Sequence, residues 1–136
     1  MMRAVVTGGA GFIGSNLSRA LLSRGHSVSV LDDFSTGRRE NLAGVERDVK
    51  LFEGDIRDDG LLARAFKGAE VVFHQAALPS VARSVEAPFD SHDVNATGTL
   101  KVLLAARKAG ARRVVYASSS SAYGNTPALP KVETMA

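Results

Sequence analysis

Short apolar runs alternate along this chain with segments in which apolar residues recur at helical spacing. The apolar runs are rich in β-branched residues and predict strands over residues 3–7, 26–31, 49–53, 71–75 and 112–117. Helices are predicted after the first run, where Ile13, Leu17, Ala20, Leu21 and Leu22 share one side, and over residues 38–43, 60–67 and 89–109. Residues 79–88 are polar and predict a loop with a turn of helix.

This alternation predicts an α/β fold built on a doubly wound parallel sheet, because right-handed helical crossovers join successive parallel strands. The expected strand order is 3-2-1-4-5. A ligand then binds at the carboxyl ends of the strands, where the order reverses between the first and the fourth. Several small or polar segments fall at these ends, namely the glycines of residues 8–14, Asp32, Asp55, residues 76–77 and residues 118–121.

The first predicted strand runs into Gly9-x-Gly11-x-x-Gly14, and a helical pattern follows directly. In this context the spacing is typical of a dinucleotide-binding loop. We expect Gly11 to let the backbone approach a pyrophosphate and Gly14 to let the helix pack closely on its strand. The positive end of the helix dipole then faces the phosphates. The alternative is a plain tight turn between a strand and a helix.

Asp32 ends the second predicted strand, about 20 residues past the glycines, where this fold places an acid that binds the ribose hydroxyls. A carboxylate there repels a 2′-phosphate and favours NAD over NADP. Arg38 and Arg39 follow closely and are the counter-argument, since a nearby Arg accepts that phosphate. We interpret both as surface or pyrophosphate-side charges. The alternative for Asp32 is a turn-forming residue at a strand end.

Composition limits the remaining classes. A chain of 136 residues suits one domain, and without cysteines it has neither disulfides nor thiolate metal ligands, as expected of a cytoplasmic protein. A net charge of +3 with scattered arginine pairs does not favour nucleic acid, and no apolar run is long enough for a membrane span. The first strand leaves no room for a signal peptide. His92 does not share a helix face with Asp90 and Asp93, so no metal site is predicted.

Other features have plainer interpretations. His74 lies in a buried strand and is expected to pack in the core rather than bind a ligand. Ala77 either makes room for a cofactor or simply packs closely. The serines of residues 118–121 form either part of a site or a flexible turn. The helix over residues 89–109 has a wider apolar arc than one sheet face needs, which predicts contact with another helix or subunit.

Six ordered motifs together resemble the extended short-chain dehydrogenase/reductases. They are residues 7–15, Asp32 with Asp33, residues 54–57, 74–77, 95–99 and 118–124. Within that family they are most similar to the NAD-dependent sugar-nucleotide epimerases and dehydratases. Residues 74–81, with Arg83 and Ser84, look closest to the 4-epimerases that act on UDP-glucose or UDP-N-acetylglucosamine. The resemblance implies a Rossmann-like NAD-binding domain over residues 1–136, incomplete at its carboxyl end.

The resemblance also implies roles for individual residues. Those implied to bind or flank NAD are Gly8, Gly11, Phe12, Ile13, Gly14, Asp32, Ser35, Thr36, Gly37, Asp55, Ile56, Ala76, Ala77 and Asn95. Asp55 would accept the adenine amino group, and Ala76 and Ala77 would line the nicotinamide side. Ser80, Ser84 and Ser120 would face a UDP-sugar substrate. Ser119 matches the catalytic Ser/Thr that hydrogen-bonds the reacting sugar hydroxyl.

The family's base is a Tyr whose pKa is lowered by a Lys four residues later. Here Ser120 follows Tyr116 at that spacing and Pro127 follows Tyr123, so the pair is expected beyond Ala136. We therefore expect the amino-terminal part of a longer, homodimeric epimerase, inactive alone. The alternatives are a non-catalytic NAD-binding module and a dehydratase, although a dehydratase usually has an acid pair where Ser120 and Ser121 stand.

Overall fold

A computed structural model describes residues 1–135 and contains one five-stranded parallel sheet. The strands are β1 (Arg3–Thr7), β2 (Ser27–Asp32), β3 (Val49–Glu53), β4 (Val71–His74) and β5 (Arg113–Tyr116). Their order is β3-β2-β1-β4-β5, with every neighbouring pair parallel, and this confirms the predicted topology. The order reverses between β1 and β4, so the carboxyl ends of these two strands flank the crevice in which such sheets bind ligands.

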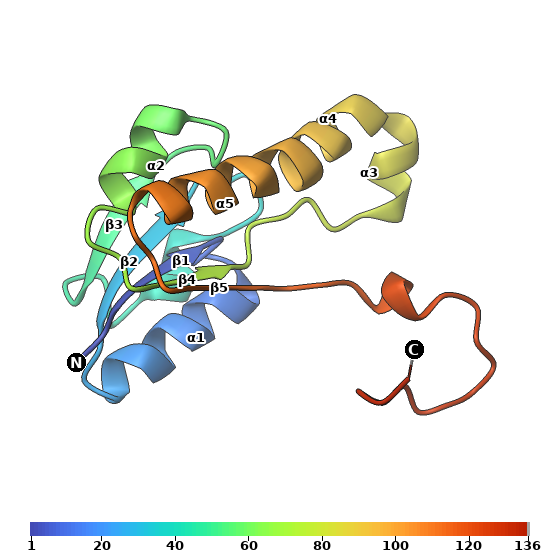
Figure 1. Cartoon of the computed structure of the whole chain (residues 1–136), viewed down its shortest axis with the longest axis horizontal. Helices are drawn as coiled ribbons and strands as arrows, with labels where there is room; N and C mark the ends of the chain where they lie inside the picture. Colours follow the sequence, from blue (N-terminus) through green and yellow to red (C-terminus); the bar gives the residue numbers. More distant parts are fainter. Residues whose placement is uncertain (136) are drawn as a thin grey trace.

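Helices cover both faces of the sheet (Figure 1). On one face lie α1 (Phe12–Ser23) and a short 3₁₀ helix, Arg39–Leu42; on the other lie α2 (Asp59–Ala65) and α5 (Thr99–Lys108). Each face has its own hydrophobic core. Val6 and Val30 belong to the core under α1, whereas Phe66, Val72 and Val102 belong to the core under α2 and α5. The domain is thus a three-layer sandwich of helices, sheet and helices.

The buried side of α1 carries small residues besides the predicted apolar ones, of which Leu17, Leu21 and Leu22 pack in the core. Small residues, Gly14 and Ser18, are buried there together with Leu21, whereas Ile13 is 61% exposed. Ser18 satisfies its hydroxyl by donating to the carbonyl of Gly14 at 2.8 Å. The apolar spacing indicated a helix correctly, but close approach to the sheet selects small side chains, and Ile13 is left at the open end of the helix.

The long helix predicted over residues 89–109 is a succession of three helical segments. These are α4 (Pro88–His92), a π-helical segment (Asp93–Gly98) and α5. The π-helical segment contains the predicted residue Asn95, and such wide turns are frequent at functional sites. Before it lies α3 (Val81–Glu86), which is longer than the predicted turn and is capped by the Ser80 hydroxyl, 3.1 Å from the Arg83 amide.

Beyond β5 the chain leaves the sheet and runs away from the body of the domain, as Figure 1 shows in red. Within this segment the structure describes a 3₁₀ turn, Ser120–Tyr123, whose side chains are largely exposed. Among residues 1–135, no helix combines the length and the apolar character needed to cross a membrane.

Candidate functional site

A cleft of about 910 Å³ opens along the carboxyl ends of the strands, a size typical of sites for small molecules. It brings together segments far apart in the chain. Predicted residues that line it are Gly8, Gly11, Phe12, Ile13, Gly14, Asp32, Ser35, Thr36, Gly37, Asp55, Ile56, Ala76, Ala77, Ser80, Ser84, Asn95 and Ser119. Ser120 is not among the lining residues, although its neighbours Ser119 and Ser121 are; it begins the 3₁₀ turn.

The glycine loop is packed too tightly for side chains. Gly8 has a φ of +67°, and a Cβ there would lie 2.7 Å from the backbone nitrogen of Ala76. A Cβ on Gly14 would lie 2.1 Å from the carbonyl oxygen of Gly8. Gly14 therefore lets the helix approach the glycine loop itself, whereas we predicted that it lets the helix pack closely on its strand.

The first turn of α1 opens onto the cleft. Among the described residues no side chain caps this turn, and the turn contains no acidic residue. Its amide groups, at the positive end of the helix dipole, are therefore available to an anion. Phe12 and Ile13 line the cleft with 82% and 61% of their surface exposed, an unusual exposure for apolar residues that a bound group would cover.

Asp32 is buried at the end of β2 and joins the glycine loop to the turn after the strand. Its carboxylate accepts one hydrogen bond from the Ala10 amide and another from the Phe34 amide, both at 2.8 Å. Asp32 therefore does form the turn after its strand, as the alternative interpretation proposed. Each carboxylate oxygen has a further lone pair, so the same group can also accept ribose hydroxyls from the cleft.

Asp55, at the end of β3, is held by Arg57. The Arg57 side chain bonds the Asp55 carboxylate through Nε and Nη2, and its Nη1 lies 2.7 Å from the Asp93 carboxylate in the π-helical segment. These contacts lower the pKa values of both aspartates and raise the pKa of Arg57. Asp55 is therefore a fixed carboxylate, and Arg57 ties the predicted adenine side of the cleft to the helix opposite.

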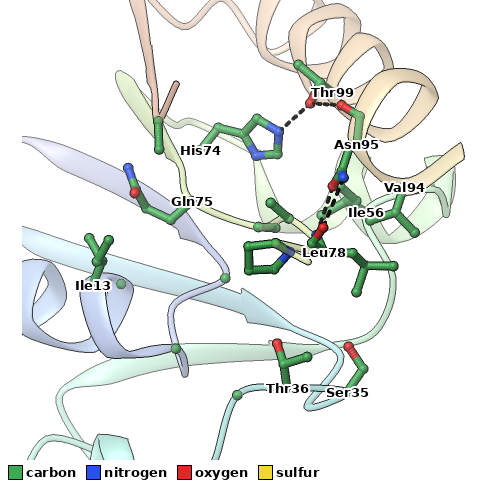
Figure 2. Close-up of a pocket in the computed structure, with 18 of the residues that line it drawn as sticks. Ile13, Ser35, Thr36, Ile56, His74, Gln75, Leu78, Val94, Asn95 and Thr99 are labelled. Atoms are coloured by element: carbon green, nitrogen blue, oxygen red, sulfur yellow. Dashed lines mark hydrogen bonds between the residues drawn. The ribbon is translucent and has the colours of Figure 1, made fainter. Parts of the chain in front are cut away.

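Asn95 holds the loop that follows β4. Its side-chain Oδ1 accepts from the Leu78 amide at 2.8 Å, and its Nδ2 donates to the Leu78 carbonyl at 3.2 Å (Figure 2). The side-chain amide thus pairs, through both of its groups, with both backbone groups of Leu78, which belong to the two peptide units on either side of that residue. This pairing fixes the segment that carries Ala76, Ala77 and Ser80 along the cleft wall.

A partly buried hydrogen-bond chain runs from β1 through β4 to α5 next to this loop. His74 lies between two hydroxyls. Its Nδ1 is 2.6 Å from Oγ1 of Thr7, and its Nε2 is 2.9 Å from Oγ1 of Thr99, as Figure 2 shows. Thr99 Oγ1 lies 2.7 Å from the Asn95 carbonyl, to which it donates, and Thr7 Oγ1 accepts from the Ala76 amide at 3.3 Å.

These partners assign one tautomer to His74. Because Thr99 donates its only proton to Asn95, Nε2 of His74 must be the donor to Thr99, and Nδ1 accepts from Thr7. Burial lowers the pKa of His74, which agrees with a neutral ring. His74 is buried, as predicted, but it is a hydrogen-bonded residue of the cleft wall. The sequence analysis did not predict that the hydroxyls of Thr7 and Thr99 bond His74. The available signal was that a threonine and a histidine end two neighbouring apolar strands.

Ser119 and Tyr116 lie where β5 ends. Both line the cleft, and Tyr116 is 60% exposed. The Ser119 hydroxyl accepts from the Ser121 amide at 3.1 Å and so caps the 3₁₀ turn. Within residues 1–135 no cluster of three or more metal-binding side chains occurs, so His92, Asp90 and Asp93 form no such group.

The fold and the cleft define a Rossmann-like α/β domain whose glycine loop meets the crevice at the reversal of strand order. The model of the NAD-dependent epimerase/dehydratase family matches residues 4–136, and the chain belongs to this family. NAD is accordingly the cofactor of the family.

Individual relatives include enzymes with different reactions. The UDP-glucose 4-epimerase of Mycolicibacterium smegmatis is 51% identical over 98% of this chain and 44% of its own length. The structure of Thermus thermophilus UDP-glucose 4-epimerase in complex with NAD is 43% identical, with a TM-score of 0.86 over 98% of this chain and 43% of that one. The structure of the dTDP-glucose 4,6-dehydratase DesIV from Streptomyces venezuelae, with NAD and TYD bound, is 39% identical. Its TM-score is 0.89 over 99% of this chain and 45% of that one. The chain spans less than half the length of each.

Proposed function

We propose that this chain binds NAD along the cleft and supplies the NAD-binding part of a UDP-sugar 4-epimerase. The observation that carries the proposal is the meeting of an uncapped helix start, a glycine loop closed to side chains and the Asp32 carboxylate in one cleft. The residues fit the cofactor chemically. Amide donors face the position of a diphosphate, a carboxylate faces ribose hydroxyls, and exposed apolar residues lie beside both.

The proposed pose follows the cleft from one side of the sheet to the other. Phe12, Ile13 and Gly14 meet the pyrophosphate through backbone amides at the α1 start. Asp32 holds the adenosine ribose, with Ser35, Thr36 and Gly37 beside it, and Asp55 and Ile56 flank the adenine. Ala76 and Ala77 line the nicotinamide side, where Asn95 and His74 support the loop.

The substrate side is proposed to lie near Ser80, Ser84 and Ser119. When bound, NAD accepts a hydride from a sugar carbon and returns it. The task of Ser119 is then to hydrogen-bond the reacting hydroxyl, and Ser120 is proposed as a neighbour that approaches only with substrate. The high identity to UDP-glucose 4-epimerases supports UDP-sugars. The similarity to DesIV keeps a sugar-nucleotide dehydratase as the second candidate.

A calorimetric titration of the purified chain with NAD tests cofactor binding directly. We expect saturable 1:1 binding that weakens at least tenfold in Asp32→Ala, because hydrogen bonds to a charged group are worth about 1.5–3 kcal/mol. Asp48→Ala is the matched control, since it removes an equally charged but exposed residue outside the cleft. Equal affinity of the two variants would refute the assignment of the ribose to Asp32.

Product analysis tests whether this chain converts a nucleotide sugar by itself. The chain is incubated with UDP-glucose and NAD, and the nucleotide sugars are resolved by chromatography. We expect NAD binding without turnover, because neither Tyr116 nor Tyr123 has a lysine four residues later. Formation of a 4-keto-6-deoxy sugar would favour the dehydratase, and a 4-epimer formed by this chain would show that another residue replaces the missing base.

We further propose that the protein forms a homodimer through α5. Leu100, Leu103 and Leu104 lie on this helix with 56%, 43% and 47% of their surface exposed. Such a patch of large apolar side chains on one helix is typical of a surface that packs against another helix.

A further inference from the structure

Arg39 lies beside the cleft but is engaged elsewhere. Its guanidinium carbon is 4.3 Å above the ring centre of Phe34, and its Nη2 forms an ion pair with Glu53. Neither Arg39 nor Glu53 lines the cleft, although both side chains are 58% exposed. Arg39 is one of the two residues, with Arg38, that the sequence analysis raised as possible acceptors of a 2′-phosphate.

The pair lies next to the proposed ribose site. Glu53 is the register partner of Asp32 across β2 and β3, and Gly54, the next residue, lines the cleft. Phe34 lies between two further lining residues, Asp33 and Ser35, and its φ of +57° is rare for a non-glycine residue. This left-handed turn and the stacking of Arg39 on the Phe34 ring bring the guanidinium to the edge of the site.

We propose that Glu53 adds to the specificity for NAD over NADP by retaining Arg39 as its own ion-pair partner. The inference rests on the proposed NAD site and adds a residue to it. A 2′-phosphate carries a dianionic charge, and an Arg guanidinium binds such a group through paired N–H donors. With Glu53 ionised, Arg39 is neutralised, and a second carboxylate besides Asp32 opposes the phosphate.

The exposure of Arg39 and Glu53 to solvent limits how strongly their ion pair can affect NADP binding. Ion pairs between exposed side chains are weak and are screened by salt. The phosphate must displace Glu53 and also approach its negative charge, so both contributions act in the same direction. We therefore expect loss of the Glu53 charge to tighten NADP binding about three- to tenfold at low salt, with Asp32 still favouring NAD.

The test compares NAD and NADP binding to Glu53→Gln by calorimetry at low and high salt. Glu53→Gln keeps the shape of the side chain and removes its charge. We expect the stated gain for NADP, NAD affinity within about twofold and a smaller NADP gain at high salt. Glu46→Gln, an equal charge change at an exposed position outside the cleft, is expected to leave both affinities unchanged.

A double variant identifies the cation. In Arg39→Ala/Glu53→Gln the gain for NADP should disappear, since no guanidinium is released to the phosphate. NAD binding with no NADP gain in Glu53→Gln would overturn this inference and leave the proposed function intact. Equal gains in Glu46→Gln would also overturn it, because only net charge would then matter. Failure of the wild-type chain to bind NAD would overturn the proposed function itself.

Discussion

The side-chain amide of Asn95 pairs with both backbone groups of Leu78, donating to its carbonyl and accepting from its amide. The two residues are 17 apart in the chain. One side chain here makes the donor and acceptor pair of hydrogen bonds that two backbones make between neighbouring strands. The wide turn of the π-helical segment carries this side chain. The loop after β4, which forms the cleft wall, is therefore held at Leu78 by the helix opposite and at Ala76 by the Thr7 hydroxyl.

Hydrogen exchange at the Leu78 amide measures this pairing. In Asn95→Ala the amide loses its acceptor and should exchange about tenfold faster or more, since a neutral hydrogen bond contributes about 1 kcal/mol or more. Asn95→Asp retains an acceptor for the Leu78 amide but loses the donor to its carbonyl, so protection should largely remain. Equal exchange in wild type and Asn95→Ala would show that the loop is held by other contacts.

The neutral His74 predicts a loss of stability on mild acidification. A pKa lowered in the folded state from the usual 6.5 means that the unfolded chain binds the proton more tightly. The stabilisation is complete above about pH 6.5 and declines as the pH falls from there towards the lowered value, by at most about 1.4 kcal/mol per pH unit. The pKa values of Asp55 and Asp93 are lowered from 3.8, so their contributions are lost only at more acidic pH.

Urea unfolding between pH 7 and pH 5 checks this dependence. The His74→Gln variant should be less stable than the wild type at pH 7, and its free energy of unfolding should hardly change between pH 7 and pH 5. His92→Gln, which changes an exposed histidine, should retain the wild-type slope. A wild-type slope in His74→Gln would mean that another group takes up the proton.

Alanine at Gly14 should destabilise the protein, although alanine usually stabilises a helix. The intrinsic helical gain over glycine is about 1 kcal/mol, but the new Cβ would lie 2.1 Å from the Gly8 carbonyl oxygen. Displacing that backbone should cost about 2 kcal/mol or more and weaken NAD binding. In α2, Gly60→Ala meets only side-chain atoms, at 3.3 Å or beyond, and should be neutral or stabilising in a thermal melt. Similar effects of the two substitutions would contradict the close packing.

Glutamate at Leu103 should abolish self-association. The residue belongs to the apolar patch on α5, and a carboxylate buried between two copies would be unpaired. Light scattering over a range of concentrations should give a dimer for the wild type and a monomer for Leu103→Glu. Leu129→Glu, which alters an equally apolar residue that is 82% exposed in the carboxyl-terminal segment, should remain dimeric. A wild-type monomer at high concentration would refute the proposed dimer.

Local patterns were sufficient to predict the architecture. Alternation of β-branched runs with helical spacing predicted the strand order, since parallel strands leave few topologies to choose from. The glycine spacing and Asp32 predicted where the cleft begins because both depend on short-range backbone geometry. Most of the predicted lining residues lie at or just after the carboxyl ends of strands, and the position of a residue in the sequence is enough to indicate this.

Local sequence patterns did not predict the contacts between distant segments of the chain. The bond from Arg57 to Asp93 joins residues 36 apart, and that between His74 and Thr7 joins residues 67 apart. Neither pair has a local spacing that marks it. The π-helical turn was also missed, because an added residue in a helix changes which side chains face the sheet without changing composition. The apolar spacing gave no sign that Ile13 is exposed, because periodicity identifies a face but does not indicate where a helix extends past its sheet.

The hydrogen bonds of Asp32 to Ala10 and Phe34 have a kinetic consequence. They hold the glycine loop in its turn through the protein's own atoms, so no part of this loop has to fold around an incoming molecule. Association should then be a single collision-limited step, linear in ligand concentration without a plateau in stopped-flow traces. Differences in affinity among variants outside this loop would appear chiefly in how long the ligand stays bound.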